Sequence, residues 1–147
     1  MDLVAFFSAT GVTKKYAMSL VGHLKADYFE ITPVKSYGKS DLNWMNPLSR
    51  SSREMRKKDS RPEFIKRELD ISKYNKIYLG FPIWWYTAPH IINSFLEAYD
   101  FTNKTIVLFA TSGSSGFGKT IESIKKSAPN SKVIEGSVNP KDFSWVK

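Results

Sequence analysis

Residues 3–13 read Leu-Val-Ala-Phe-Phe-Ser-Ala-Thr-Gly-Val-Thr, and this stretch decides the fold. Its first half is a short, wholly apolar run, which is typical of a strand covered on both faces in a parallel sheet. Its second half brings three hydroxyl side chains and one glycine together in the six residues that lead into a helical pattern. The stretch therefore predicts a buried strand that turns directly into a helix.

Four further runs have the composition of strands. Residues 76–81 and 105–110 are apolar after their first residues, Lys76 and Thr105, and rich in residues that favour strands, so they predict two more central strands. Residues 28–31 and 132–138 mix apolar and polar side chains, which suits the two edges of a sheet. We expect five strands in all.

Helical spacing of apolar residues lies between these runs. It predicts helices over residues 12–24, 88–99 and 117–128, with Thr87 as the N-cap of the second. Residues 33–74 are polar, basic and poorly periodic, and only a short helix around 51–58 is expected there. Strands that alternate with helices imply an α/β fold with a parallel sheet, right-handed connections and helices on both faces.

Composition narrows the class of protein. A chain of 147 residues fits one domain, residues 1–147, and the absence of cysteine excludes disulfides, thiolate metal sites and a cysteine nucleophile. No signal peptide is apparent, and no apolar run approaches the roughly 18 residues that a membrane span needs. We expect a cytoplasmic protein without a membrane or metal site.

The formal net charge is +8, and part of this excess is local. Residues 50–67 carry eight basic and three acidic side chains. Such a basic segment could attract an acidic protein, a nucleic acid or a charged substrate, or it could be a solvated face with no partner. The sequence alone leaves both interpretations open.

The first turn carries the clearest chemistry. In open parallel sheets, ligands bind beyond the carboxyl ends of the strands. Ser8, Thr10 and Thr13 offer hydroxyl donors, Gly11 lets the backbone curl close to an anion, and the helix that follows begins with unpaired N–H groups. This combination suits a phosphate monoester, although an ordinary turn in which Thr10 or Thr13 caps the helix would look similar.

Two later turns supply flat and polar surfaces. The second contains Trp84, Trp85 and Tyr86, three aromatic side chains that could cover a planar conjugated ligand or instead fill a core or a subunit interface. The third, residues 111–118, is small and rich in N–H donors, which suits the polar edge of a heterocycle.

Together these sequence motifs resemble those of a short flavodoxin-like family, and the resemblance covers nearly the whole chain. The resemblance rests on residues 7–13, 80–85 and 110–113, and on a middle segment that contains Asp41-Leu42-Asn43-Trp44, Ser49-Arg50-Ser51 and Glu54. It implies a flavodoxin-like three-layer sandwich with strand order 2-1-3-4-5 and FMN as the cofactor.

The resemblance also implies where the cofactor would lie. The residues that would hold the phosphate are Ser8, Thr10, Gly11, Val12 and Thr13. The residues that would lie along the isoalloxazine ring, with backbone groups near its N5, are Pro82, Ile83, Trp84 and Trp85. Those at the pyrimidine edge are Thr111, Ser112 and Gly113, and a cover over the site would come from Trp44, Ser49 and Arg50.

Three features depart from the flavodoxin pattern. Flavodoxins that carry electrons are typically acidic, whereas this chain is basic. The sequence ends soon after the fifth predicted strand, so a final helix is expected to be short or absent. Lys14 and Lys15 follow the first turn directly and could neutralise the phosphate or face solvent.

A rival motif lies in the third turn. Residues 113–120 match G-x-x-x-x-G-K-[ST] and would predict a nucleoside triphosphate, with Lys119 on its phosphates and Thr120 on magnesium. We reject this reading because no later strand ends in a magnesium-binding aspartate, and because it leaves the first turn and the two tryptophans unexplained.

The expected function is electron transfer between proteins, with an acidic redox partner docked on the basic segment. The alternative is an FMN-dependent NAD(P)H oxidoreductase that acts on quinone-like acceptors, and either could be a monomer or a homodimer. No catalytic set is visible: His23 is expected on the surface, while His90 could approach the cofactor. Nucleic-acid binding is a weaker third reading, because aromatic and basic residues are not interleaved as in known folds.

Charge also predicts a property of the flavin. Reduction adds negative charge, which nearby cations favour. We therefore expect Arg50, Arg53 and Lys57 to make this flavin easier to reduce than one in an acidic carrier.

Overall fold

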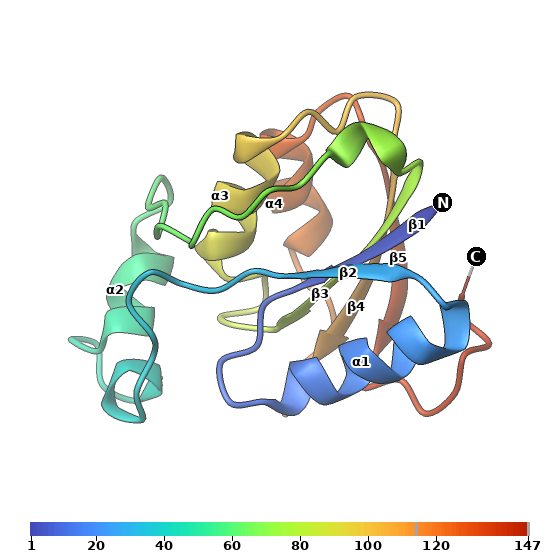
Figure 1. The fold of residues 1–147 in the computed structure, drawn as a ribbon. Helices are drawn as coiled ribbons and strands as arrows, with labels where there is room; N and C mark the ends of the chain where they lie inside the picture. The colour runs from blue at the N-terminus through green and yellow to red at the C-terminus, as the bar shows by residue number, and fades with distance from the viewer. Residues whose placement is uncertain (114, 147) are drawn as a thin grey trace.

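The computed structural model describes residues 1–113 and 115–146, and it contains one five-stranded parallel sheet in the order β2-β1-β3-β4-β5 (Figure 1). The strands are β1 (Asp2–Phe6), β2 (Asp27–Glu30), β3 (Lys76–Pro82), β4 (Thr105–Thr111) and β5 (Lys132–Val138). The helices are α1 (Val12–Leu24), α2 (Arg50–Arg56), α3 (His90–Ala98) and α4 (Thr120–Ser127), with short 3₁₀ turns η1 (Ser40–Leu42) and η2 (Ile71–Lys73). The predicted fold class and strand order are confirmed.

The three apolar runs form the centre of the sheet, as predicted, because both of its faces are covered. On one face, α1 and the segment after β5 pack against a cluster that includes Tyr78 and Phe109. On the other face, α3 and α4 cover a larger core that includes Phe81 and Phe95. Helices on the two sides of the sheet give the three layers visible in Figure 1. The mixed runs form β2 and β5, the two edge strands.

The helix boundaries differ from the predicted ones at the N-terminal side. Helix α3 begins at His90 with Pro89 as its N-cap, so the prediction that Thr87 caps it is wrong. Thr87 instead exchanges backbone hydrogen bonds with Trp84, which holds it in a tight turn before the helix. Helix α4 begins at Thr120 rather than at residue 117, because Phe117 and Gly118 belong to the loop before it.

The segment after β5 has no helix in its described part, residues 139–146. Phe143 and Trp145 of this segment pack beside α1 against the same cluster. The described residues contain no helix with the length and apolar character that crossing a membrane requires.

The long polar segment places α2 apart from the main layers. Figure 1 shows α2 beyond the carboxyl ends of the strands, away from α1 and α3. Its bounds, Arg50–Arg56, are close to the predicted helix at 51–58. The segment therefore borders the edge of the sheet where ligands bind in open parallel folds.

Two glycines provide a matched test of the packing. A Cβ at Gly80 on β3 would lie 2.2 Å from the buried Phe109 ring, whereas a Cβ at Gly22 in α1 would meet nothing within 4 Å. We expect Gly80→Ala to lower the free energy of unfolding by about 1–3 kcal/mol. We expect Gly22→Ala to raise it by about 0.5–1 kcal/mol, because alanine suits a helix interior better than glycine. Urea unfolding of both variants checks this, and equal effects would contradict the packing described.

Candidate functional site

The loops that follow β1, β3 and β4 meet at the carboxyl edge of the sheet. The backbone N–H of Phe7 donates to the Gly80 carbonyl at 3.0 Å, and that of Ile83 donates to the Thr111 carbonyl at 2.8 Å. These bonds continue the strand pairing one residue into each loop. The three turns that the sequence singled out are therefore neighbours.

The first loop leaves the start of α1 without a side-chain cap. Gly11 is the N-cap, with a left-handed φ of 94°, and among the described residues no side-chain cap bonds to the start of the helix. Neither Thr10 nor Thr13 takes the capping role that an ordinary turn would give it. Ser8 Oγ instead accepts the N–H of Gly11 at 3.0 Å, which fixes the loop while the Ser8 hydroxyl can still donate. The helix start thus has N–H groups and a positive dipole end available for an anion.

Thr13 is the one predicted phosphate residue that is buried. Only 1% of its surface is exposed, and its hydroxyl lies 2.8 Å from that of Thr111 at the end of β4. This contact brings together two predicted site residues that are far apart in the chain. In this arrangement Thr13 and Thr111 brace the first loop against the third.

The second loop is a strained two-residue turn. Trp84 and Thr87 pair through two backbone hydrogen bonds, and the two residues between them, Trp85 and Tyr86, both have left-handed φ values of 55° and 66°. Turns of this kind favour Asn-Gly, and a left-handed conformation costs an ordinary L-residue roughly 1–2 kcal/mol. Strain of this size concentrates at functional sites, because there it places particular side chains.

The third loop is tied to this turn. The Lys119 N–H donates to the Tyr86 carbonyl at 2.9 Å, and a Cβ on Gly118 would lie only 2.2 Å from the same oxygen. Thr120 donates its hydroxyl to the Phe117 carbonyl, which ties the first residue of α4 to the loop before it. The Gly-Lys-Thr triplet of the rival triphosphate motif therefore has a structural use here, while Ser114 of that motif lies outside the described residues.

An aromatic cleft of about 540 Å³ opens between the second loop, the third loop and the middle segment. The described residues that line it are Leu42, Trp44, Ser51, Ile83, Trp84, Trp85, Tyr86, Ser112, Gly113 and Ser115. Five of the predicted cofactor residues are among them: Ile83, Trp84, Trp85, Ser112 and Gly113. Trp44, which was expected to cover the site, also lines the cleft.

The other predicted cofactor residues do not line the cleft. Thr10, Gly11 and Val12 line a separate groove on the α1 side of the first loop. Pro82 and Thr111 pair with each other at the ends of β3 and β4.

Four lining residues were not among the predicted cofactor residues: Leu42, Ser51, Tyr86 and Ser115. Tyr86 and Ser115 do belong to the two turns that the sequence singled out. For Leu42 and Ser51, nothing in the pattern indicated how the long segment returns to the strand ends.

Arg50 and Ser49 do not line the cleft. Ser49 is buried and caps α2 by accepting the N–H of Ser52. The Arg50 guanidinium lies 3.8 Å from the centre of the Tyr37 ring, and its Nε donates to Glu54 Oε2 at 2.9 Å. Arg50 therefore holds the middle segment together, and its charge is balanced by Glu54.

Tyr37 connects this contact to the cleft wall. Its hydroxyl donates to Glu54, and its ring meets that of Trp84 edge-on at 5.3 Å. Burial, followed by the Glu54 contact, raises the pKa of Tyr37 far above its usual range, so the phenol stays protonated. Tyr37 thereby fixes the back of Trp84, while other faces of Trp84 line the cleft.

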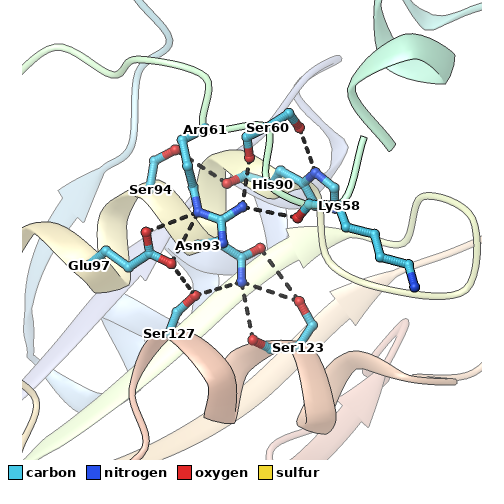
Figure 2. A network of polar contacts seen from close by, with 9 residues as sticks. All are labelled: Lys58, Ser60, Arg61, His90, Asn93, Ser94, Glu97, Ser123 and Ser127. Atoms are coloured by element: carbon cyan, nitrogen blue, oxygen red, sulfur yellow. Dashed lines mark hydrogen bonds and ion pairs between the residues drawn. The ribbon is translucent and has the colours of Figure 1, made fainter. Parts of the chain in front are cut away.

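The end of the basic segment is anchored by a polar network on α3 and α4 (Figure 2). Arg61 Nε donates to both carboxylate oxygens of Glu97 at 3.0 Å, and Ser127 donates to the same carboxylate at 2.6 Å.

His90 Nδ1 lies 2.6 Å from Ser60 Oγ, whose hydroxyl donates to the Glu54 carbonyl. His90 is buried under this loop and does not reach the cleft lining, whereas His23 is exposed as predicted.

Several other cations have structural partners. Arg56 donates to the Pro47 carbonyl at 2.7 Å, and Arg67 donates to the Glu30 carbonyl at 3.1 Å. Lys14 pairs with Glu30 at 3.1 Å, whereas Lys15 is exposed. The basic segment is thus partly a set of anchors that attach residues 33–74 to the domain.

The family model for flavodoxin matches residues 1–144. The chain belongs to this flavodoxin family. A candidate flavoprotein from Bacteroides eggerthii DSM 20697 is 40% identical, with a TM-score of 0.88 over 94% of this chain and 87% of that one. No curated protein sequence matches the chain.

More distant structures share the fold. A flavoprotein from Lactobacillus acidophilus NCFM, determined in complex with FMN, is 20% identical with a TM-score of 0.77 over 99% of this chain and 98% of that one. An NADH:FMN oxidoreductase is 14% identical with a TM-score of 0.54, covering 93% of this flavodoxin and 74% of that chain. The family recognised from the sequence is confirmed.

His90 generates a prediction about pH. Burial, and then the nearby Arg61 charge, lower the pKa of His90 below its ordinary value of 6.5. The unfolded chain then binds more protons than the folded one as pH falls below about 6.5, so stability should decrease toward pH 5. Urea unfolding at several pH values should show this slope in the wild type and in His23→Asn. A slope between pH 7 and 5 that persists in His90→Asn would contradict the assignment.

Proposed function

We propose that this flavodoxin binds FMN across the first loop and the aromatic cleft and carries electrons between proteins. One observation supports this most strongly: the uncapped start of α1 and a cleft walled by tryptophans lie along the same edge of the sheet. The uncapped helix start suits a phosphate dianion, and the aromatic cleft suits a planar ring. FMN, the cofactor that the family assignment supports, contains both groups.

The residues present fit this cofactor. A Cβ at Gly11 would meet nothing within 4 Å, so the space beside the first loop is open. Ser8 and Thr10 have hydroxyls available for a phosphate oxygen, with the N–H groups of α1 beside them. In the described part of the chain, Thr87 Oγ1 is a buried hydroxyl without a partner, at the foot of the turn that carries Trp85. Such a donor set and aromatic wall match the two ends of the molecule.

When bound, FMN supplies the redox chemistry, and the chain supplies position and environment. Trp84 and Trp85 would hold the ring and exclude water from its faces. Ser112, Gly113 and Ser115 would meet its polar edge with hydroxyl and N–H groups. Tyr37 would keep Trp84 in place from behind.

The cleft chemistry favours a carrier over an acid–base enzyme. Among its described lining residues, the only titratable side chain is that of Tyr86. His90 is committed to Ser60 and lies outside the lining. Electron transfer needs no proton donor from the protein, so this composition suits it. An NAD(P)H oxidoreductase remains the alternative, and rapid bleaching of the flavin by NADPH alone would favour it.

The rim of the cleft suits an acidic protein partner. Trp44, Met45 and Leu48 are 68%, 75% and 73% exposed. Arg53 lies exposed on the neighbouring α2, and Lys57 lies exposed directly after that helix. An exposed apolar centre beside cations is the composition of a transient docking surface. Association should therefore slow steeply as salt rises.

The phosphate site is tested by comparing FMN with riboflavin. We expect FMN to bind at least 100-fold more tightly, equivalent to about 2.7 kcal/mol. Thr10→Glu should weaken FMN at least tenfold by placing a like charge beside the phosphate, yet leave riboflavin unchanged. Thr102→Glu, an exposed position in a distant loop, is the control. Isothermal titration measures all six affinities, those of the two ligands for the wild type and for the two variants. Equal binding of FMN and riboflavin by the wild type would overturn the proposed function.

Charge on α2 should tune the bound flavin. Electron uptake adds negative charge, so Arg53→Glu and Lys57→Glu should each lower the midpoint potential, by on the order of tens of millivolts for a charge about 10 Å away. Arg50 is left out of this test because it is paired with Glu54. Lys132→Glu, at the opposite end of the strands, should have little effect. Spectroelectrochemistry at low ionic strength measures the midpoint potential of the bound flavin in each variant. Identical midpoint potentials in all three variants would contradict the proposed effect of charge.

A further inference from the structure

A second groove, of about 590 Å³, adjoins the first loop on the side away from the aromatic cleft. We name it the α1 groove, because it runs between α1 and the segment after β5. Thr10, Gly11 and Val12 form the end of the groove that meets the first loop. The proposed function uses only the end of this space, at Thr10, Gly11 and Val12, and does not use the rest of it. The volume of the groove falls within the roughly 300–1,000 Å³ typical of small-molecule sites.

The groove has an aromatic wall that is held in place. Trp145 packs on Tyr78 and Phe109, with ring centres 6.0 and 5.8 Å away, and its Nε1 donates to the Asp142 carbonyl at 2.9 Å. Phe143 stacks on His23 at 4.0 Å with the ring planes nearly parallel. Tyr16 of α1 contributes a third ring to the lining. Preformed aromatic surfaces of this kind suit a flat heterocycle.

The charge of the groove is positive. Lys15 and Lys141 line it and are exposed, and neither forms one of the ion pairs found among the described residues. The one carboxylate in the lining, that of Asp142, accepts hydrogen bonds from the N–H and hydroxyl of Ser144 at 3.0 and 2.7 Å. An anion with two or more charges would therefore meet two lysines and the start of α1.

We propose that the α1 groove binds the phosphate-bearing adenosine of an adenine nucleotide. The base would stack on Tyr16, Phe143 or Trp145, and the phosphates would lie toward Lys15, Lys141 and the first loop. The groove is both aromatic and cationic, and it opens on the proposed phosphate-binding loop. It therefore fits an adenine nucleotide better than it fits a purely apolar ligand. The proposal rests on the proposed function only for the junction at the first loop.

Two sources could supply this chemistry. The adenylate could belong to FAD, with the flavin phosphate on the first loop and the adenosine continuing into the α1 groove. It could instead belong to a separate nucleotide that binds while FMN occupies the aromatic cleft and the first loop, and whose phosphates then lie against Lys15 and Lys141 only. Titrating apoprotein with FMN and FAD, and FMN-loaded protein with ADP, distinguishes the two.

For the FAD source, the apoprotein should bind FAD at least fivefold more tightly than FMN. Lys141→Glu should remove this preference and leave FMN affinity within twofold of the wild type. For a separate nucleotide, FMN-loaded protein should bind ADP at least tenfold more tightly than pyrophosphate, and Lys141→Glu should weaken ADP at least fivefold. Lys125→Glu, an exposed lysine on α4 across the sheet, is the matched control for both arms.

A spectroscopic readout places the ligand independently of affinity. The ¹H–¹⁵N indole signal of Trp145 should shift on addition of ADP or FAD and stay fixed on addition of pyrophosphate. The proposal is overturned if neither FAD preference nor ADP binding is found, or if Lys125→Glu reduces binding as much as Lys141→Glu does. Binding of ADP without any binding of FMN would sink the proposed function and leave this inference standing.

Discussion

Thr13 and Thr111 share a buried hydrogen bond of 2.8 Å, and the arrangement of the site depends on it. The bond joins the loop after β1 to the end of β4, two strands that are not neighbours in the sheet. Strand pairing aligns β3 between them, and the hydroxyl pair adds a direct contact between the start of α1 and the end of β4. The uncapped helix start and the aromatic cleft take their relative positions from this brace.

The long middle segment, residues 33–74, is attached to the domain largely by side-chain contacts rather than by strand pairing. Phe64 and Tyr74 join it to the core, and cations attach its more polar parts to the domain through specific contacts. Arg50 joins Tyr37 and Glu54, Arg61 joins Glu97, and Arg67 reaches the Glu30 carbonyl. Buried or carbonyl-bound arginines serve this purpose because a guanidinium offers several donors in a fixed plane. Much of the excess positive charge is therefore structural, and the exposed remainder on α2 is what a partner would meet.

The sequence predicted the sheet well because a strand buried on both faces must be apolar throughout, which leaves a plain pattern in residues 3–7, 76–81 and 105–110. It predicted five cleft residues because they directly follow those strands. It failed at Thr87, where a turn formed by backbone hydrogen bonds replaced the expected cap. It also failed at Arg50, because local pattern does not show that an arginine will lie over a tyrosine thirteen residues earlier. Long-range side-chain contacts of this kind have no periodic signature.

The central claim is that the first loop holds a phosphate dianion, and ³¹P NMR of the FMN-saturated protein tests it most directly. A free phosphate monoester takes up its second proton near pH 6. On this account the bound phosphate resonance is displaced from that of free FMN and stays constant from pH 8 to pH 5, because N–H groups of α1 favour the dianion. A resonance that coincides with free FMN and titrates near pH 6 would contradict it.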